Sequence, residues 1–349
     1  MKDFSKIDKN FKVETKLNEK NIVFKNALEA PFKIYGVFKE NGRFRRMPEG
    51  VAKQVSEGVH FLHTNTAGGR VRFTTDSRFV AINAKVSDTA SFPHFALCGT
   101  SGFDLYADGV FCNSFIPPKN LEDSYEKILY FEGNKRREIT INFPSYCSVS
   151  ELYVGLEDGA SVGAPTPYKY EKPVVFYGSS ITQGGCASTP GMSYENIVSR
   201  HLDCNYVNLG FSGNAMAEES IAEYVSTLDM SVFVYDYDHN SPNTEHLQAT
   251  HERMFKTVRE KNPSLPIILM SRPKYMLNDE EKKRLEIITT TYNNAINNND
   301  KNVYLIDNKA LTALCLGQGT VDNCHPTDFG FASMAIAVEK VLKDVLMRM

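Results

Sequence analysis

The sequence has 349 residues, of which 42% are hydrophobic and 23% are charged. This is the composition of an ordinary globular protein, and it excludes a disordered, fibrous or coiled-coil chain. Lysine and arginine total 39 and aspartate and glutamate total 42, so the net charge is −3. So small a balance predicts neither a nucleic-acid partner nor an anionic membrane partner. No apolar run approaches the about 18 residues that a membrane-spanning helix needs.

The chain ends and the cysteines favour a reducing compartment. The N-terminus, MKDFSKIDKNFKVETK, has no apolar core and is not a secretory signal, so a cytoplasmic location is expected. There are seven cysteines, an odd number, without a CxxC pair. Their wide spacing disfavours a disulfide framework or a structural zinc site, and free buried thiols are expected.

Residues from about 30 to 156 alternate apolar and polar side chains in short runs. In the run 79–86, Val80, Ile82, Ala84 and Val86 alternate with other residues, as they would on a half-buried strand. The other strand-like runs are Phe32–Phe38, Val59–His63, Arg70–Thr75, Phe95–Cys98, Phe103–Ala107, Ile128–Phe131, Ile139–Phe143 and Leu152–Leu156. Many short strands separated by turn residues predict an antiparallel β-sandwich, for which a jelly roll is one topology. A single short helix is expected near Gly50–Ser56.

From Pro173 the pattern changes to apolar strand-length runs alternating with helical periods. The predicted strands are Val174–Tyr177, Asn205–Leu209, Ser231–Tyr235, Pro266–Met270 and Val303–Ile306. Near-continuous apolar strands alternating with helices predict a five-stranded parallel sheet with helices on both faces, a three-layer α/β/α fold. Three helix starts are predicted, with Ser193, Asn278 and Thr327 as N-caps.

The segment 157–167 is rich in Gly, Pro and small residues, as linkers are. The sequence therefore predicts a β-sandwich domain over residues 1–165 and an α/β/α domain over residues 166–349.

Hydrogen-bonding residues follow the predicted parallel strands, where ligands bind in such sheets. The first three strands are followed by Gly178-Ser-Ser-Ile-Thr-Gln-Gly-Gly185, Gly210-Phe-Ser-Gly-Asn214 and Asp236-Tyr-Asp-His-Asn240. The fourth leads to Ser271-Arg272-Pro273, and a loop beyond the fifth contains Asp322-Asn-Cys-His325. A hydroxyl, an imidazole, a carboxylate and amide donors at one edge are the groups that acyl transfer needs.

Other motifs do not fit these loops. Gly-Lys-Ser/Thr of a P-loop, GxGxxG and the GxSxG elbow are all absent. The run from Asp236 lacks the glycine and glutamate of an EF-hand loop. His60 and His63 are taken as ordinary histidines that point to opposite faces of a strand.

At this point the sequence resembles the SGNH (GDSL-like) hydrolases. The resemblance matches Ser180 to the nucleophile, Gly213 and Asn240 to the second and third blocks, and Asp322 with His325 to the last block. Gly102-Phe-Asp-Leu-Tyr106 is similar to the GxDLY signature of a β-domain found beside a subgroup of these esterases. Two departures stand out: Ser179 replaces the usual aspartate, which leaves two adjacent serines as nucleophile candidates, and the third block lacks the usual Gly-x-Asn-Asp form.

The resemblance implies a mechanism and a substrate class. His325 would activate Ser180, Asp322 would orient His325, and the oxyanion hole would comprise the Ser180 and Gly213 N–H groups and the Asn240 amide. No metal or organic cofactor is implied. The favoured reaction is hydrolysis of a short acyl ester, acetyl above all, on a carbohydrate; the substrate is a small molecule or oligosaccharide, and no oligomeric state is predicted.

Alternatives remain beside this hypothesis. Within enzymes, the alternative is an acyl hydrolase or acyltransferase acting on other small esters or thioesters; outside them, it is a non-catalytic carbohydrate-binding protein. Taken singly, Ser180 could be a turn residue, Gly213 a turn glycine and Asn240 a cap. Gln183 and Arg272 are expected at the substrate pocket, although a salt bridge is an equal alternative for Arg272. His239, Cys186 and Cys324 are expected to be structural.

Overall fold

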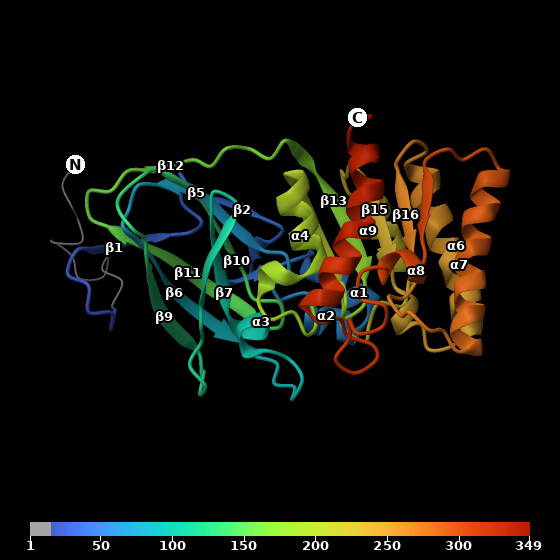
Figure 1. The fold of residues 1–349 in the computed structure, drawn as a ribbon, viewed down its shortest axis with the longest axis horizontal. Coiled ribbons are helices and arrows are strands. Elements are labelled where there is room, and N and C mark those ends of the chain that lie inside the picture. Colours follow the sequence, from blue (N-terminus) through green and yellow to red (C-terminus); the bar gives the residue numbers. More distant parts are fainter. Residues whose placement is uncertain (1–14) are drawn as a thin grey trace.

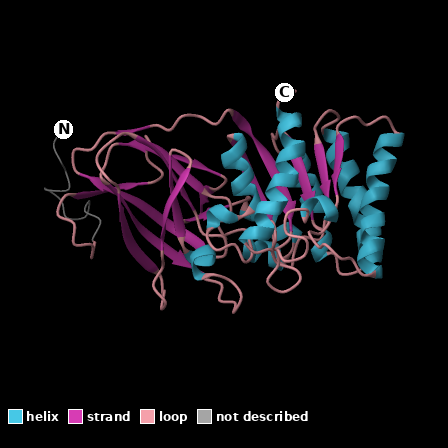
Figure 2. Cartoon of the chain, in the orientation of Figure 1, coloured by secondary structure: helices cyan, strands magenta, loops and turns pink. Residues whose placement is uncertain are grey.

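The computed structural model describes residues 15–349 and contains an antiparallel region and a parallel α/β region side by side (Figures 1 and 2). Residues 1–14 lie outside the described part. The expected lack of a signal peptide is based on residues 1–16, so most of that segment is not described. Among the described residues, no helix combines the length and the apolar character needed to cross a membrane.

The antiparallel region consists of two main sheets and a separate two-stranded hairpin. One sheet has the order β1 (Ile22–Asn26), β11 (Ser148–Glu157), β6 (Phe79–Ser87) and β9 (Ser124–Tyr130). The other has the order β12 (Val162–Gly163), β5 (Arg70–Thr75), β10 (Arg137–Asn142), β7 (Phe103–Ala107) and β8 (Val110–Phe115), and β2 (Lys33–Tyr35) also pairs with β5. The hairpin is β3 (Phe38–Glu40) with β4 (Arg43–Arg45).

Both main sheets bury one face in a shared core. Val80, Ile82 and Ala84 of β6 meet Ile139 and Ile141 of β10 in that core, and all five side chains are fully buried. Because strand side chains alternate between faces, this arrangement is the structural basis of the alternation seen in the sequence. The predicted packing of antiparallel sheets is confirmed.

The C-terminal half is built on the predicted five-stranded parallel sheet. Its order is β14 (Cys204–Gly210), β13 (Tyr170–Gly178), β15 (Val232–Asp236), β16 (Ile267–Met270) and β17 (Val303–Ile306), and every neighbouring pair is parallel. Along β13, Val174 and Phe176 enter one core, whereas Val175 and Tyr177 enter the other. Burial on both faces therefore explains why these strands read as continuous apolar runs.

Helices cover both faces of this sheet. One core includes side chains of α4 (Tyr194–Leu202), α8 (Asn308–Leu311) and α9 (Asp328–Leu346), and the other those of α5 (Glu219–Ser226), α6 (Thr244–Lys261) and α7 (Asp279–Asn297). The Asn278 and Thr327 side chains cap α7 and α9 as predicted. Ser193 also occupies an N-cap position, but its side chain makes no capping hydrogen bond.

Several predictions for the N-terminal half are wrong. Val59–His63 is not a strand: it lies in α2 (Glu57–Leu62) and its C-cap, because Ser56 accepts a hydrogen bond from the Val59 N–H and starts a helix. The rings of His60 and His63 therefore stack at 5.4 Å instead of pointing to opposite faces. Phe95–Cys98 leads into α3 (Leu97–Ser101), and Phe32–Phe38 is divided at Gly36, whose φ is +74°.

Helices α1 (Glu49–Val55) and α2 lie against the parallel-sheet half, where Figure 1 shows them among its helices. Ala52, Val59 and Leu62 are buried in the same core as Ile221 of α5. Helix α1 confirms the predicted helix near residues 50–56, but the expectation of a single helix is wrong, because α2 and α3 also belong to this half. The N-terminal half thus contributes apolar surface to the core beneath the loops that follow the parallel strands.

Candidate active site

Ser180 lies in the turn that follows β13. A Cβ on Gly178 would lie 2.1 Å from the Asp236 carbonyl oxygen, so only glycine allows the strand to end this close to its neighbour. Ser180 Oγ lies 2.9 Å from His325 Nε2. The adjacent Ser179 Oγ instead accepts a hydrogen bond from the Ile181 N–H at 3.2 Å. The structure therefore brings Ser180, and not Ser179, to the imidazole.

Asp322 holds His325 in place through two contacts, one with the backbone N–H of His325 and one with its imidazole ring. The Asp322 Oδ2 atom lies 2.8 Å from His325 Nδ1, and Oδ1 accepts from the His325 N–H at 2.7 Å. Burial alone would raise the pKa of Asp322, but the hydrogen bonds from His325 outweigh it and hold the pKa at about 2. Asp322 is therefore ionised at neutral pH and favours the tautomer in which Nδ1 of His325 carries the proton.

This histidine loop is partly open to solvent. The side chains of Asp322 and His325 are 37% and 19% exposed, whereas Ser180 as a whole is 6% exposed. Water can therefore reach the imidazole, while the serine backbone stays fixed in the interior.

Gly213 and Asn240 lie on loops that start beside the serine turn. Gly178 pairs with Gly210 on β14 and with Asp236 on β15, so the three following loops leave the same edge of the sheet. Gly213 has φ +69°, and a Cβ there would meet nothing within 4 Å, so its backbone faces open space.

The Asn240 amide is oriented by a hydrogen bond from the Ala215 N–H to its Oδ1, at 3.2 Å. Within residues 15–349, the N–H groups of Ser180 and Gly213 and the Asn240 Nδ2 have no hydrogen-bond acceptor. Three donors at this edge are therefore free to bind a developing anion.

Gln183 does not line the pocket, contrary to its predicted position. Its side chain is fully buried, donates to Asn65 Oδ1 at 3.0 Å and to the Ser145 carbonyl at 3.1 Å, and accepts from the Ser212 N–H at 3.0 Å. All polar atoms of this amide are thus occupied. Gln183 ties the N-terminal half to the loop that carries Gly213.

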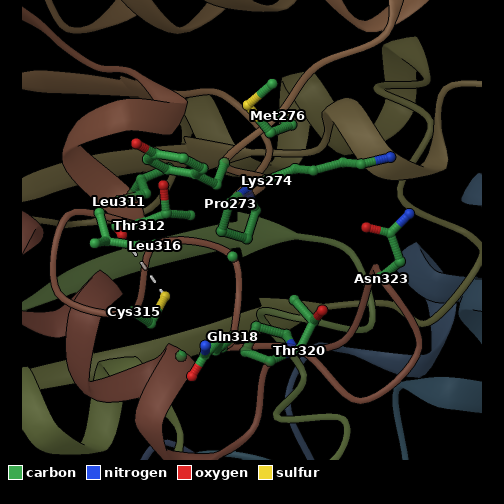
Figure 3. A pocket seen from close by; sticks show the side chains of 15 residues that line it. Pro273, Lys274, Met276, Leu311, Thr312, Cys315, Leu316, Gln318, Thr320 and Asn323 are labelled. Carbon is green, nitrogen blue, oxygen red and sulfur yellow. Dashed lines mark hydrogen bonds between the residues drawn. The ribbon is translucent and has the colours of Figure 1, made fainter.

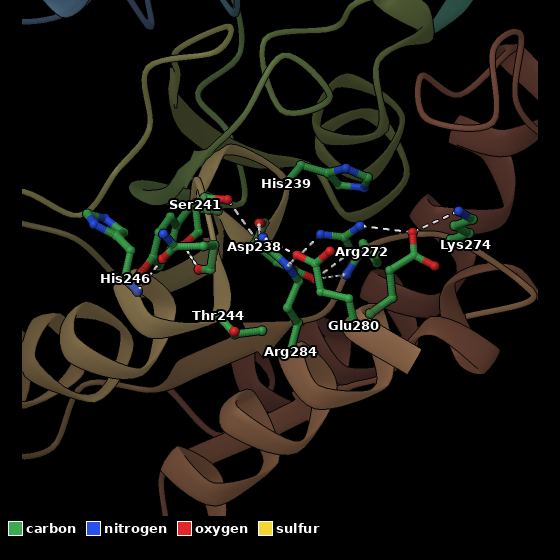
Figure 4. Close-up of polar contacts among 12 residues, drawn as sticks. Asp238, His239, Ser241, Thr244, His246, Arg272, Lys274, Glu280 and Arg284 are labelled. Carbon is green, nitrogen blue, oxygen red and sulfur yellow. Dashed lines mark hydrogen bonds and ion pairs between the residues drawn. The ribbon is translucent and has the colours of Figure 1, made fainter. Parts of the chain in front are cut away.

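Arg272 does not occupy a substrate-binding position either. It forms salt bridges, which is the alternative that the sequence left open. Its guanidinium donates to Asp238 at 2.9 and 3.0 Å and to Glu281 at 3.1 Å, and its side chain is 11% exposed (Figure 4). Arg284 donates to the Asp238 carbonyl in the same network. Burial would raise the pKa of Asp238, but Arg272 holds it below its usual value.

This network supports the turn Asp238–Asn240 and thereby the Asn240 side chain. Within it, burial and the Arg272 charge lower the pKa of His239 to about 3, so that its ring is neutral. Its Nδ1 lies 3.5 Å from Cys324 Sγ.

Side chains from the N-terminal half complete the surroundings of His325, and the sequence did not reveal them. Tyr146 donates a hydrogen bond to the Ser180 carbonyl at 3.1 Å. The ring centroid of Phe95 lies 5.6 Å from that of His325, and His94 Nε2 lies 3.7 Å from Asp322 Oδ2. These residues occupy loops of the sandwich, more than 100 residues from the last block. No local pattern could have indicated the contact.

Two further residues of the N-terminal half hold loops of the site. The buried Arg46 guanidinium donates to the Gly210 carbonyl and, at 2.8 Å, to the Leu62 carbonyl. Asp104, the aspartate of the GxDLY motif, accepts from the Gly191 N–H at 2.6 Å. The motif was recognised in the sequence, and the structure now gives its aspartate a contact with the loop that follows Ser180.

A pocket of about 290 Å³ lies beside the histidine loop (Figure 3). Its walls include Lys274, Met276, Leu316 and Thr320, and Asn323 and Pro326 join it to the loop of His325. Ser180, Asp322 and His325 do not line it. The pocket is thus a neighbour of the serine–histidine pair and does not enclose it.

Nitrogen, sulfur and oxygen atoms around His325 could also hold a metal ion. Within the described chain, the donor atoms of His94, Cys186 and His325 lie within 4.8 Å of one another, as do those of Asp322, Cys324 and His325. Burial raises the pKa of Cys186 to about 12 and that of Cys324 to about 11. Both thiols are therefore protonated at neutral pH and are poor nucleophiles.

Comparisons with known proteins agree with this architecture. Residues 171–343 match the model of the GDSL-like lipase/acylhydrolase family, and residues 22–162 match that of the N-terminus of SGNH-hydrolase-type esterases, named GxDLY. No curated protein matches the chain.

Several solved structures share the whole arrangement. A protein described as a GDSL-like lipase from Bacteroides ovatus is 29% identical, covers 94% of this chain and 98% of its own, and has a TM-score of 0.83. The salicylyl-acyltransferase SsfX3 is 17% identical over 94% and 98%, with a TM-score of 0.77. An acetyl xylan esterase from Butyrivibrio proteoclasticus is 13% identical over 93% and 99%, with a TM-score of 0.60.

The fold and these matches define the class of the protein. The chain belongs to the GDSL-like hydrolases of the SGNH type and is an esterase. More narrowly, it has the two-part architecture in which a GxDLY domain precedes the hydrolase domain.

Proposed function

We propose that this esterase hydrolyses short-chain acyl esters, above all acetyl esters of carbohydrates, with Ser180 as nucleophile, His325 as general base and Asp322 as the orienting carboxylate. The observation that carries the proposal is the continuous chain from Ser180 Oγ to His325 Nε2 at 2.9 Å and from His325 Nδ1 to Asp322 Oδ2 at 2.8 Å. A serine hydroxyl needs a base in this position to become a nucleophile.

The reaction divides into acylation and deacylation. Ser180 Oγ attacks the ester carbonyl carbon while His325 Nε2 takes the hydroxyl proton, and the same proton then passes to the departing alcohol. Water next attacks the carbonyl carbon of the acyl-serine while His325 takes one of its protons. The bond from that carbon to Ser180 Oγ then breaks, His325 returns the proton to Oγ, and the carboxylic acid leaves. Asp322 stays ionised throughout and stabilises the imidazolium that forms in each half. No step needs a metal ion or an organic cofactor.

The three unpartnered donors act on the negative charge of each tetrahedral intermediate. We assign the oxyanion to the Ser180 and Gly213 N–H groups and to the Asn240 Nδ2 atom. Such a donor typically lowers the barrier by about 3–4 kcal/mol, because it is already aimed at the oxygen when the charge develops. Gln183, Arg46 and Arg272 support this hole by holding its loops.

Phe95 and Tyr146 pack closely against the turn that carries Ser180. A Cβ on Gly185 would lie 3.0 Å from Phe95 Cζ, from the Ser180 carbonyl oxygen and from Tyr146 Oη. A side chain at position 185 would therefore collide with the serine turn and with these two rings.

The alcohol part of the substrate lies on the side of His325, because His325 returns the proton to the leaving oxygen. Phe95 packs against His325, and Phe92 packs on Phe95 at 4.9 Å while remaining 48% exposed. An exposed ring beside the leaving group can stack on the apolar face of a sugar. The acetyl xylan esterase with this architecture supports the same substrate class.

Acetate release from acetylated xylo-oligosaccharides, measured beside a p-nitrophenyl ester series from acetate to octanoate, tests this proposal. We expect turnover of the acetylated sugar and a kcat/KM that falls with chain length. Phe92→Ala should raise KM for the oligosaccharide and leave p-nitrophenyl acetate unaffected, with the exposed Phe111→Ala as the matched control. Transfer of the acyl group to an added alcohol in preference to water would instead indicate an acyltransferase. A protein that retains glycans, hydrolyses no ester and is not labelled at Ser180 by a phosphonate would instead be a binding protein.

A further inference from the structure

Three residues from separate segments, His94, Cys186 and His325, bring nitrogen and sulfur donor atoms close together. The proposed hydrolysis uses only His325. His94 comes from a loop of the N-terminal half, Cys186 follows the serine turn, and His325 belongs to the last loop. Their donor atoms lie within 4.8 Å of one another. Neither His94 nor Cys186 has a part in acylation or deacylation.

This donor set has the chemistry that zinc prefers. Zinc binds imidazole nitrogen and thiolate sulfur at about 2.0–2.3 Å in tetrahedral geometry, which places donors about 3.3–3.6 Å apart. From separations of at most 4.8 Å, the donors reach this geometry by approaching one another by no more than about 1.5 Å. His94 can supply that movement, because its side chain is 33% exposed and its loop has no helix or strand.

His325 is already prepared as a ligand. Its Nδ1 faces Asp322 Oδ2 at 2.8 Å, so the lone pair of Nε2 points away from the carboxylate toward Ser180. A carboxylate behind the second ring nitrogen is the usual support of a metal-binding histidine, since it fixes the tautomer and increases basicity. The Nε2 lone pair cannot bind a metal and accept the Ser180 proton at the same time.

Cys186 is held in place by its backbone. Its φ of +69° lies in the left-handed region that non-glycine residues rarely adopt. The residue is 8% exposed, between the serine turn and the N-terminal half. Zinc binding would displace the proton of the Cys186 thiol to solvent, and the resulting thiolate, with the nearby Asp322 carboxylate, would balance the charge of the ion.

The second donor group, Asp322 with Cys324 and His325, is the weaker candidate. Both Asp322 oxygens already accept hydrogen bonds from His325, and Oδ1 also accepts from the Cys324 N–H at 3.1 Å. A metal would have to displace these contacts.

We propose that His94, Cys186 and His325 bind a zinc ion, and that this zinc inhibits the esterase by occupying the nitrogen that activates Ser180. The inhibition rests on the proposed function, whereas the binding of zinc does not.

Zinc titration of the full chain against a chromophoric chelator tests the binding without turnover. We expect one high-affinity zinc per chain, a thiolate-to-metal charge-transfer band with Co²⁺, and dissociation constants raised by about tenfold or more in Cys186→Ser and His94→Gln. Cys112→Ser, which changes an exposed thiol on β8, is the matched control and should bind as the wild type does. Absence of stoichiometric binding, or loss of binding only in Cys324→Ser, would overturn the assignment.

Inhibition is then measured on p-nitrophenyl acetate, each variant relative to its own rate without metal. Zinc should inhibit the wild type, a chelator should restore the rate, and His94→Gln should need about tenfold more zinc. Zinc that binds through Cys186 and leaves hydrolysis unaffected would refute the inhibitory role. A wild type that binds zinc but hydrolyses no ester even when free of metal would refute the proposed function and not the site.

Discussion

Substitution of Asn240 tests the assignment of the oxyanion hole. Its Oδ1 accepts from the Ala215 N–H, whereas its Nδ2 has no acceptor within the described residues. Asn240→Asp keeps an acceptor for Ala215 but replaces the free donor by a negatively charged oxygen. Asn240→Ala removes both groups.

Asn240→Ala should have a small effect on the free energy of unfolding and a large effect on kcat. Loss of the Ala215 hydrogen bond in Asn240→Ala should lower the free energy of unfolding by about 1 kcal/mol. Loss of the oxyanion donor should lower kcat by about 100- to 1,000-fold, equivalent to about 3–4 kcal/mol of barrier, with little change in KM. Asn240→Asp should lose at least as much activity, because its charge repels the oxyanion.

Steady-state kinetics on p-nitrophenyl acetate and urea denaturation separate these effects. We expect Asn240→Asp to retain its fold and to lose kcat. A kcat within about threefold of wild type in both variants would remove Asn240 from the oxyanion hole, since one such donor is worth far more.

Three further predictions concern carboxylates and their partners. Asp322→Asn should lower kcat by about 10³–10⁴-fold on p-nitrophenyl acetate, because His325 would lose its preferred tautomer; a loss below tenfold would speak against the orienting role. Arg272→Met removes the guanidinium that bridges Asp238 and Glu281 but leaves Arg284 and Lys274 beside them, so it should lower the free energy of unfolding by about 2–3 kcal/mol in urea denaturation, while a raised KM with unchanged stability would restore Arg272 to the substrate pocket. Burial raises the pKa of Asp236 to about 7, above its value of 3.8 in an unfolded chain, so its contribution to stability is present below pH 4 and is lost as pH rises to 7. Asp236→Asn should therefore unfold less readily than wild type at pH 8, by up to about 4 kcal/mol, and a stability difference independent of pH between 4 and 8 would contradict this.

The parallel sheet and the chemical blocks could be predicted because their causes are local. Strands such as 174–177 are buried on both faces, which imposes apolar residues at every position. Because parallel strands end at one edge, the loops that follow them could be expected to meet there. The serine turn and the turn of Asn240 do start from that edge, and the last loop, which follows α8, meets the serine turn through His325.

The direction in which polar side chains point could not be predicted. Gln183 stands in the expected loop, yet it turns inward because Asn65, 118 residues away, offers an acceptor. Arg272 likewise turns to Asp238, 34 residues earlier. Partners so distant in sequence are fixed by tertiary packing alone.

Helix α2 shows the same limit for local structure. Val59, Phe61 and His63 alternate as a strand would, and this alternation predicts a strand. The segment is a helix for two reasons. Ser56 caps its N-terminus, and Val59 and Leu62 are both buried in the core around Ile221, which their helical spacing allows. Likewise, nothing in the sequence around His94 or Tyr146 could indicate that the sandwich reaches the histidine loop.

The central claim is that Ser180 is the nucleophile of an ester hydrolase, and p-nitrophenyl acetate hydrolysis by wild type, Ser180→Ala and Ser179→Ala tests it most directly. Ser180 faces His325 at 2.9 Å, whereas Ser179 is bonded within its own turn. We expect an active wild type, an inactive Ser180→Ala and a Ser179→Ala that retains most of its activity. An inactive Ser179→Ala beside an active Ser180→Ala would contradict the claim.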